Sequence, residues 1–467
     1  MNKQDKKNVL KYGAGLIVLA GIVMITLVPN AKESLLGSVV NIGQSRSAAT
    51  LSAVKVDLKK NLSLVSLDRK KQNPKFGYNG WFLEAIVRGK NPEADLAVIA
   101  EALNDTGATW LRFPGGTRAN KYVPDLSVGG LGVGDNFDKS FSKNLIEYYA
   151  DYVIQMGNKT KTTYVINMAA HFPDYYGGAS KVPGAFKGKT DDQIIDLNIK
   201  GVEYLLSRGI KVEYVEIGNE GYLHNYSKNR NSKTAQKSLK EVEAIMKPEM
   251  DKYEELVIKY VKKLDEVAQK NKTSLKYGVP YATIRANKNR VYLGGQAGRN
   301  EYWNTRMAAL PVHAAVPHLY TETGDCTGPF MNKNQRTKCL IDESNNYVRD
   351  ELGSIIDRTR QLSGGKEIWI TEFNAGLGHD SGDLRANTDF VNSPEHISII
   401  KRMVEIFEDR NVENYMFHML SSSNSGYAVV NKNASSTAKM TVEGAEMKVT
   451  NSICGLLTNR NSRVVCD

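Results

Sequence analysis

The stretch Val215-Glu216-Ile217-Gly218-Asn219-Glu220 passes from an apolar, β-type run into a polar turn that ends in a glutamate. A second stretch, Trp369-Ile370-Thr371-Glu372-Phe373-Asn374, also places a glutamate at the end of an apolar run. Short runs of β-branched and aromatic residues are typical of buried parallel strands. We therefore interpret both stretches as carboxyl ends of strands, where the working residues of α/β barrels lie.

Runs of this kind alternate with helical periodicity along most of the chain. The eight candidate strands are Lys75–Tyr78, Thr109–Phe113, Thr163–Met168, Val212–Ile217, Leu275–Val279, Val312–Leu319, Glu367–Thr371 and Asn414–Leu420. Helical stretches lie near 92–106, 139–156, 191–208, 247–270, 296–310, 343–363, 394–410 and 443–457. Eight alternations predict an α/β fold of the (β/α)8 TIM-barrel type, because an open doubly wound sheet usually has fewer strands.

The first 30 residues look like a targeting segment. Four lysines among the first eleven residues precede an uncharged apolar run from Tyr12 to Val28. This order is typical of a cleaved signal peptide or of an uncleaved signal anchor, and the sequence leaves both open. Either one predicts an extracytoplasmic protein, secreted or membrane-anchored. We interpret 1–30 as this segment, 31–72 as a stalk or lead-in, and 73–467 as the barrel.

The cysteines agree with export. Of the four, Cys326 lies near Cys339 and Cys454 near Cys466, which favours two local disulfides, with free buried thiols as the alternative. The sequence has no C-x-x-C spacing, and Gly184–Thr190 is one residue short of a phosphate-binding loop. We therefore expect no metal and no cofactor. The net charge of +11 suits an anionic partner, but no nucleic-acid-binding motif is present, so we expect no nucleic acid.

Glu220 and Glu372 suit the hydrolysis of a glycosidic bond. Retention of configuration needs one carboxyl to protonate the leaving oxygen and a second to attack the anomeric carbon, about 5–5.5 Å apart. The tips of strands four and seven lie across the mouth of a barrel from each other. One such glutamate alone would more often be a strand-capping residue, but the two together predict a catalytic pair.

These motifs resemble the retaining clan of (β/α)8 glycoside hydrolases known as clan A. In that clan an Asn-Glu ending strand four supplies the acid/base, and a glutamate ending strand seven supplies the nucleophile. More narrowly, Leu111-Arg112-Phe113-Pro114-Gly115-Gly116 resembles the Arg-aromatic-Pro-Gly-Gly segment of the α-L-arabinofuranosidase and heparanase-like branches. The resemblance covers roughly residues 75–457. It implies a retaining glycosidase with Glu220 as acid/base and Glu372 as nucleophile.

The resemblance also implies roles for four further residues. Arg112 would lie beside the nucleophile and hold it ionised, and Asn219 would bind the 2-hydroxyl of the sugar. His318 matches a histidine that contacts the sugar ring, and Tyr320 matches a tyrosine bonded to the nucleophile.

Two more residues are weaker candidates for substrate binding. Glu84 resembles a substrate-binding acid of the arabinofuranosidase branch, and His171 follows strand three, but a hydrogen-bonded loop role is equally open for both. Strand eight lacks the tryptophan that many clan members place under the sugar, and we expect His418 or Phe417 to substitute for it. Little room remains for an accessory β-sandwich, so we expect a bare barrel or one with a rudimentary strand pair.

The sequence thus predicts a glycosidase that hydrolyses O-glycosyl bonds of a polysaccharide or oligosaccharide. Basic residues of three loops predict an anionic substrate: Arg118, Lys121, Lys228, Arg230, Lys233, Lys237, Lys240, Arg285, Lys288, Arg290 and Arg299. The alternative is a non-catalytic carbohydrate-binding or matrix protein on the same barrel, held at a membrane if the N-terminal segment is uncleaved. Opposed carboxylates favour the enzyme, because a pure binder does not need them. The oligomeric state is left open.

Overall fold

The computed structural model describes only part of the chain. The described residues are 72–79, 83, 87, 92–127, 130–132, 140–157, 159–176, 182–224, 239–284, 294–321, 326, 331–375, 390–391, 393–418, 439–442, 445–448 and 464–465. The predicted targeting segment, 1–30, and almost all of the predicted stalk lie outside them. Among the described helices, none combines the length and the hydropathy needed to cross a bilayer.

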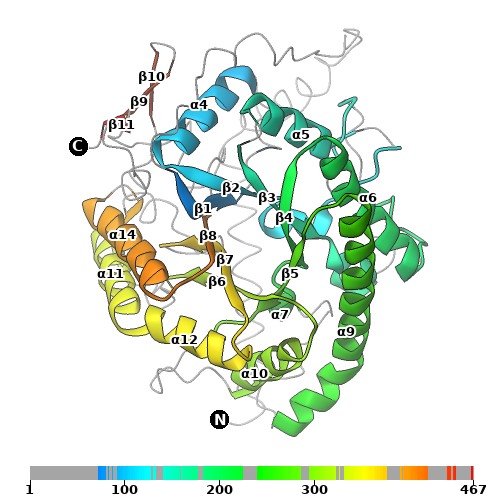
Figure 1. The fold of residues 1–467 in the computed structure, drawn as a ribbon. Coiled ribbons are helices and arrows are strands. Elements are labelled where there is room, and N and C mark those ends of the chain that lie inside the picture. Colours follow the sequence, from blue (N-terminus) through cyan, green and yellow to red (C-terminus); the bar gives the residue numbers. More distant parts are fainter. Residues whose placement is uncertain are drawn as a thin grey trace, which may run out of the picture. The chain divides into compact units, whose positions relative to one another are not determined.

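Eight parallel strands close into a barrel in the order β1 to β8 (Figure 1). The strands are β1 (Asn73–Asn79), β2 (Ala108–Phe113), β3 (Lys161–Ile166), β4 (Lys211–Ile217), β5 (Lys276–Tyr281), β6 (Ala314–Tyr320), β7 (Glu367–Asn374) and β8 (Asn414–Phe417). Every predicted strand overlaps an observed one, and the predicted barrel is confirmed. The pairing of β1 with β8, in which Phe76 lies opposite Tyr415, completes the closure.

Helices surround the barrel, as Figure 1 shows. They are α4 (Pro92–Asp105), α5 (Leu145–Gln155), α6 (Asp191–Ser207), α7 (Gly221–His224), α9 (Leu239–Lys270), α10 (Gly294–Ala308), α11 (Lys333–Asn346), α12 (Leu352–Leu362) and α14 (Pro394–Asp409). Shorter turns are η2 (Gly116–Lys121), η3 (Met168–His171), η4 (Pro173–Tyr176) and η7 (Tyr347–Glu351). Several helices begin where the sequence supplies a cap: Asn144 and Thr190 form capping boxes at α5 and α6.

The structure corrects the helix predictions at two places. The stretch predicted as one helix near 343–363 consists of the end of α11, the π-turn η7 and α12. The helix predicted near 443–457 is wrong over 445–448, which forms the strand β10 (Ala445–Lys448) beside β9 (Lys439–Val442). Val442 pairs with Ala445, so only Glu443-Gly444 connects the strands, and a glycine in a two-residue connection is a hairpin signal. With β11 (Val464–Val465) these strands form a three-stranded sheet, one strand more than the expected pair.

The barrel interior is filled by stacked aromatic rings. Tyr214 lies between Trp369 and Trp110, at ring-centroid distances of 3.9 and 4.4 Å. These rings come from β4, β7 and β2, which are not neighbours in the sheet, so they can meet only inside the barrel. Gly278 on β5 makes room for them, because a Cβ atom there would lie 2.9 Å from the Trp369 ring.

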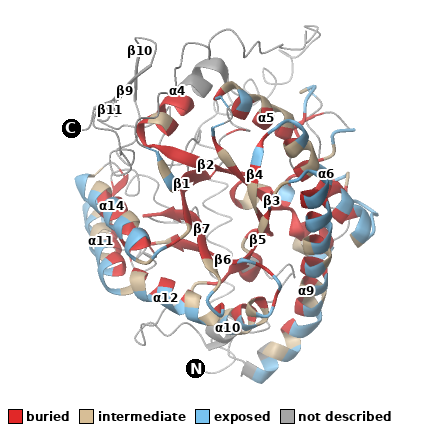
Figure 2. Cartoon of the chain, viewed as in Figure 1, coloured by how far each residue is buried: buried red, intermediate tan, exposed pale blue. Residues whose placement is uncertain are grey.

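Burial follows this layering. Figure 2 shows the barrel strands coloured mostly as buried, whereas the surrounding helices are buried mainly on the side facing the barrel. On α14, for example, Ile399, Ile400, Met403 and Phe407 are buried and alternate with exposed positions at helical spacing. The apolar core therefore lies between strands and helices, which leaves the carboxyl ends of the strands to carry polar residues.

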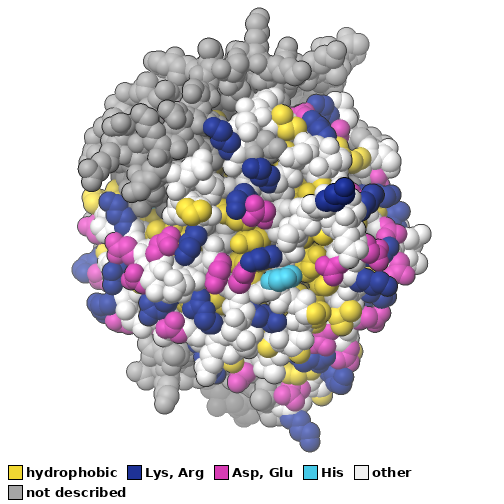
Figure 3. All heavy atoms as spheres, in the orientation of Figure 1, with side chains coloured by type: hydrophobic (Ala, Val, Ile, Leu, Met, Phe, Trp, Pro, Cys, Tyr) yellow, Lys and Arg dark blue, Asp and Glu magenta, His cyan; other side chains and the backbone are white. Residues whose placement is uncertain are grey.

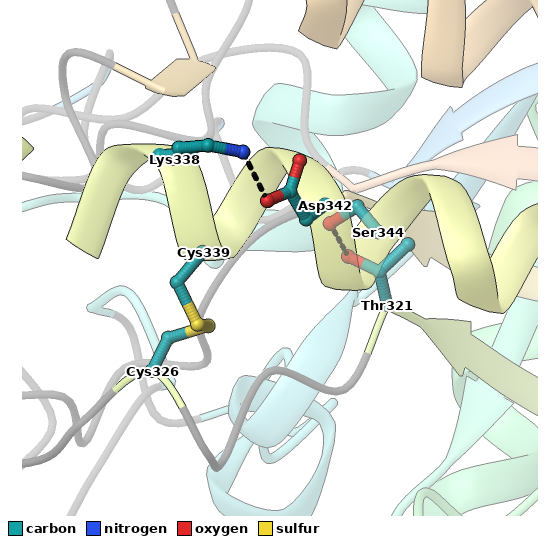
Figure 4. Close-up of a disulfide and its surroundings, with 6 residues drawn as sticks. All are labelled: Thr321, Cys326, Lys338, Cys339, Asp342 and Ser344. Carbon is teal, nitrogen blue, oxygen red and sulfur yellow. Dashed lines mark hydrogen bonds and ion pairs between the residues drawn. A yellow bond between two sulfur atoms is a disulfide. The ribbon is translucent and has the colours of Figure 1, made fainter. Parts of the chain in front are cut away.

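One predicted disulfide is present. Cys326 and Cys339 are bonded, with a Cα–Cα distance of 5.6 Å, and they tie the loop after β6 to α11 (Figure 4). Further along α11, Ser344 Oγ donates a hydrogen bond of 2.9 Å to Thr321 Oγ1, which fixes the end of β6 to the same helix. Cys454 and Cys466, the second predicted pair, lie outside the described residues.

Candidate active site

Polar side chains gather at the carboxyl ends of the barrel strands. Glu216 and the turn residues Asn219 and Glu220 come from β4 and its loop. The other strands supply Asn79 (β1), Arg112 (β2), His318 and Tyr320 (β6), Glu372 (β7) and His418, which follows β8. Most of them are nearly inaccessible to solvent, and buried charges of this kind must be paired and hydrogen-bonded.

Arg112 is the central cation of the site. Its guanidinium is fully buried and donates two hydrogen bonds of 2.7 Å to the Glu216 carboxylate. It also donates to Glu372 Oε1 at 2.6 Å and to Asn219 Oδ1 at 2.8 Å. Burial would lower the pKa of Arg112, but the two carboxylates raise it above its ordinary value. Arg112 therefore remains charged and joins β2, β4 and β7.

Glu372 is held ionised although it is only 3% exposed. Its Oε1 accepts hydrogen bonds from Arg112 and, at 2.9 Å, from Asn79 Nδ2. Its Oε2 accepts one of 2.6 Å from the hydroxyl of Tyr320. Burial acts to raise the pKa of Glu372, but the charged His318 and Arg112 and the hydroxyl of Tyr320 lower it, and this pKa lies far below the ordinary value of 4.5.

Glu220 has a different environment from Glu372. It follows Asn219 in a sharp turn, with φ angles of 103° at Gly218 and 48° at Glu220 itself. Positive φ is uncommon for a residue other than glycine, and strained backbone of this kind clusters at active sites and ligand-binding turns. The Glu220 side chain is 17% exposed, and its Oε1 is bonded to His318 Nδ1 at 2.9 Å.

His318 lies between the two glutamates. Burial lowers its pKa, but the carboxylates of Glu372, Glu216 and Glu220 together raise it to about 10. At neutral pH the ring is therefore an imidazolium that donates Nδ1–H to Glu220. Its Nε2 lies 3.2 Å from Thr371 Oγ1, which fixes the ring plane.

The two glutamates face each other at short range. One carboxylate oxygen of Glu220, one of Glu372 and a ring nitrogen of His318 all lie within 4.8 Å of one another. Two carboxylates and a histidine are ligand types that divalent cations use, and here His318 Nδ1 is hydrogen-bonded to Glu220 Oε1 at 2.9 Å. The arrangement is therefore suited to proton transfer and to attack by a carboxylate.

The remaining candidates lie in different places. His171, in η3, bonds Asp191 at 2.8 Å through Nδ1 and the Tyr260 hydroxyl at 2.9 Å through Nε2. Both ring nitrogens are thus engaged with α6 and α9, and no hydrogen bond or ion pair described for its ring reaches Glu220 or Glu372. Glu84 lies outside the described residues. Phe417, one of two expected substitutes for a platform tryptophan, packs in the core against Phe373, whereas His418 borders the site.

Sequence reasoning missed two residues of this cluster. Asn79 is the last residue of β1, one position beyond the predicted strand end, so it was not recognised as a strand-tip residue. Glu216 lies within β4 and not beyond its tip, so the strand-end pattern does not select it. A charged residue within a mostly apolar strand indicates a buried ion pair. Glu216 in β4 and Arg112 in β2 are two such residues of opposite charge.

Fold and site together define a closed (β/α)8 barrel with opposed carboxylates at its carboxyl end. No protein-family model matches the sequence, and a comparison with curated proteins gives no match. Similar solved structures include a GH51 arabinofuranosidase from Xanthomonas axonopodis pv. citri (12% identity, TM-score 0.43, 79% of this chain and 70% of that chain). A second is CelM2, a bifunctional glucanase-xylanase from a metagenome library (12% identity, TM-score 0.45, 78% of this chain and 74% of that chain). A third is Thermotoga maritima Cel5A (13% identity, TM-score 0.42, 82% of this chain and 97% of that chain). Similarity of this size concerns the barrel architecture alone, and the chemistry rests on the residues of the site.

Proposed function

We propose that this protein is a retaining glycoside hydrolase, with Glu372 as nucleophile and Glu220 as acid/base. The observation that carries the proposal is the approach of the two carboxylates within 4.8 Å at the mouth of the barrel. Retaining enzymes need the shorter of the two carboxyl separations seen in glycosidases, because inverting enzymes leave room for a water molecule at about 6.5–9.5 Å.

The two environments assign the two roles. A nucleophile must be ionised, and Arg112, Asn79 and Tyr320 each donate to Glu372. An acid/base must exchange protons with the leaving group and with water, and Glu220 is the more exposed carboxyl, aimed by a turn. The opposite assignment would require Glu372 to take up a proton inside a cationic pocket.

The reaction follows in two steps. Glu372 attacks the anomeric carbon while the glycosidic C–O bond breaks, and Glu220 gives its proton to the departing oxygen. The product is a glycosyl ester of Glu372. Glu220 then takes a proton from water, the water oxygen attacks the same carbon, and the ester bond breaks to regenerate the Glu372 carboxylate.

The test uses aryl glycosides with leaving groups of different acidity, over a panel of sugars. Glu372→Gln is expected to abolish formation of the covalent intermediate. Glu220→Ala is expected to slow dinitrophenyl glycosides far less than phenyl glycosides, because a good leaving group needs no proton. Glu255→Gln, at a side chain that is 67% exposed on α9, serves as the matched control. Near-normal turnover by both site variants contradicts the assignment, and sugar binding by the wild type without turnover favours a non-catalytic binding protein.

We further propose that the substrate carries uronate or sulfate groups. Support comes from Arg118 and Lys121 on η2, which follows β2 at the same end of the barrel as Arg112. Lys240 and Arg299, predicted in loops, lie on α9 and α10, and Arg299 is buried, so neither adds to the support. The other basic loop residues lie outside the described residues. Figure 3 shows basic and acidic side chains interspersed on the face drawn, so the proposal depends on the loops and not on a uniformly basic surface. Activity on anionic glycans should fall between 0.1 and 1 M salt, because the electrostatic screening length shortens from about 10 Å to about 3 Å. Equal activity on neutral xylan or arabinan, with no salt dependence, contradicts the proposal.

We also propose that the protein is exported and either secreted or membrane-anchored. The basic and apolar order within 1–30 supports this proposal, as does the Cys326–Cys339 disulfide, since such bonds persist in oxidising compartments. Cell fractionation with N-terminal sequencing of the recovered protein separates a cleaved signal from an anchor. Recovery in the cytoplasm with reduced thiols contradicts export.

A further inference from the structure

Asn79 lies between the proposed nucleophile and a histidine. Its Nδ2 is 2.9 Å from Glu372 Oε1 and 2.8 Å from His418 Nδ1, and the side chain is fully buried. An ionised carboxylate can only accept hydrogen bonds, so the amide nitrogen, and not the amide oxygen, must face Glu372. The second hydrogen of Asn79 Nδ2 points to His418 Nδ1. An amide nitrogen cannot accept a hydrogen bond, so Asn79 must be the donor in this pair too. His418 Nδ1 is therefore the acceptor, and its ring carries the proton on Nε2.

The reverse amide orientation is unfavourable. It would place Asn79 Oδ1 against Glu372 Oε1 at the same short distance, with two acceptors facing each other and no hydrogen between them. In the observed orientation Asn79 Oδ1 is buried with no hydrogen-bond partner among the described residues. The cost of leaving this oxygen without a partner is offset because both Nδ2 hydrogens have acceptors, Glu372 Oε1 and His418 Nδ1.

The two oxygens of Glu372 are consequently not equivalent. Oε1 accepts from both Arg112 and Asn79, whereas Oε2 accepts from Tyr320 and lies 3.5 Å from His318 Nδ1 and 3.5 Å from His418 Nδ1, which is closer to Asn79 Nδ2 at 2.8 Å. The His318 ring also contacts Glu220, so Oε2 lies on the side of the acid/base.

We propose that Asn79 and His418 are positioning residues of the nucleophile. His418 accepts one amide hydrogen of Asn79, which directs the other at Glu372 Oε1 and leaves Oε2 as the attacking oxygen. This inference rests on the proposed glycosidase function and deepens it. When Oε2 bonds the anomeric carbon, the leaving oxygen departs with the bonding electrons and the proton from Glu220. Oε1 then becomes the carbonyl oxygen of the ester and still accepts from Asn79.

Variants with side chains of similar shape distinguish a role in positioning the nucleophile from a role in packing alone. Asn79→Leu keeps the branched shape and removes the donor. His418→Asn offers an amide oxygen near the position of Nδ1, whereas His418→Leu has the same branched shape without an acceptor. The probes are 2,4-dinitrophenyl 2-deoxy-2-fluoro glycosides of glucose, xylose, glucuronic acid and arabinofuranose, with covalent labelling followed by mass spectrometry.

Asn79→Leu is expected to slow labelling about 10–100-fold, since it removes a hydrogen bond to a charged oxygen at the reacting group. His418→Leu should slow labelling about tenfold, and His418→Asn should remain within about threefold of the wild type. In Asn79→Leu the probe concentration for half-maximal labelling rate should not change, because Asn79 is not proposed to bind the sugar. Loss of probe affinity with an unchanged maximal rate would overturn the positioning role.

Glu372→Gln distinguishes this inference from the function on which it rests. If Glu372→Gln is labelled like the wild type, the proposed function fails. If Glu372→Gln is not labelled but both leucine variants are labelled at the wild-type rate, only the positioning inference fails.

A second measurement needs no substrate. Nitrogen-15 NMR of ring-labelled histidines, with the His418 signals assigned through His418→Asn, is expected to show a bare Nδ1 and a protonated Nε2 at pH 7. A protonated Nδ1 would overturn the proposal whether or not any probe labels the protein.

Discussion

Arg112 Nη1 lies 2.6 Å from Glu372 Oε1 and joins strands β2 and β7, which are not neighbours in the barrel. The same guanidinium forms a two-bonded fork with the buried carboxylate of Glu216. One cation thus neutralises two carboxylates that would otherwise repel each other in a medium of low dielectric constant. Because the planar, charged guanidinium of Arg112 makes all of these bonds, Arg112 is the first target for mutation.

Arg112→Lys should damage both stability and activity. A lysine ammonium keeps the charge but cannot reach Glu216, Glu372 and Asn219 with a planar fork. We expect the free energy of unfolding to fall by about 2–4 kcal/mol and turnover by about 100-fold, measured by urea denaturation and by initial rates. Arg208→Lys, at the exposed pair with Asp151, is the control and should change stability by less than about 1 kcal/mol. Equal effects at the two sites would contradict the central role of Arg112.

His318→Asn should flatten the pH dependence of stability on the alkaline side. In the folded protein the pKa of His318 is raised from 6.5 to about 10, so its contribution is fully present below pH 6.5 and is lost as the pH rises towards 10. The wild type should therefore lose on the order of 3 kcal/mol more than the variant between pH 6.5 and 10. Urea unfolding at pH 6, 8 and 9.5 measures this difference, and parallel curves for the two proteins would contradict the assignment.

Cys326→Ala with Cys339→Ala should destabilise the protein by about 3 kcal/mol, because the disulfide closes a loop with a sequence separation of 13 residues. The wild type under reducing conditions is the internal control and should resemble the double variant. Non-reducing peptide mapping checks the connectivity directly. A peptide that joins Cys326 to Cys454 or Cys466 would be incompatible with the described bond.

Tyr260→Phe tests whether His171 has a structural role or a role in substrate binding. The Tyr260 hydroxyl bonds His171 Nε2 and accepts a hydrogen bond from Asn198, so its removal leaves buried groups unsatisfied. We expect a loss of about 1–3 kcal/mol in the free energy of unfolding, with KM and kcat unchanged. His171→Gln should behave in the same way. A raised KM for His171→Gln without loss of stability would instead favour the predicted subsite role.

Much of the barrel could be predicted locally. Strands such as Val212–Ile217 and Glu367–Thr371 could be predicted because β-branched and aromatic residues dominate them, and Ile368, Trp369 and Ile370 form a continuous buried run. The helix predicted near 443–457 failed because four-residue strands are too short for either periodicity to show, and only the glycine of a two-residue connection indicated the hairpin. The extra residues of β7 beyond Thr371 were missed because Glu372 and Asn374 are polar, although both are buried in the fold.

The sequence by itself indicated the eight strands and the position of Glu220 and Glu372 at two strand ends, and it favoured the Cys326–Cys339 bond over free thiols. These features depend on residues close together in the chain, where periodicity and spacing are visible. Only the tertiary structure decided that Asn79 and His418, separated by 339 positions, share a hydrogen bond beside Glu372, and that His171 bonds α6 and α9. A polar residue at a strand end leaves no periodic signal, and its partner is fixed only when barrel closure brings β1 beside β8.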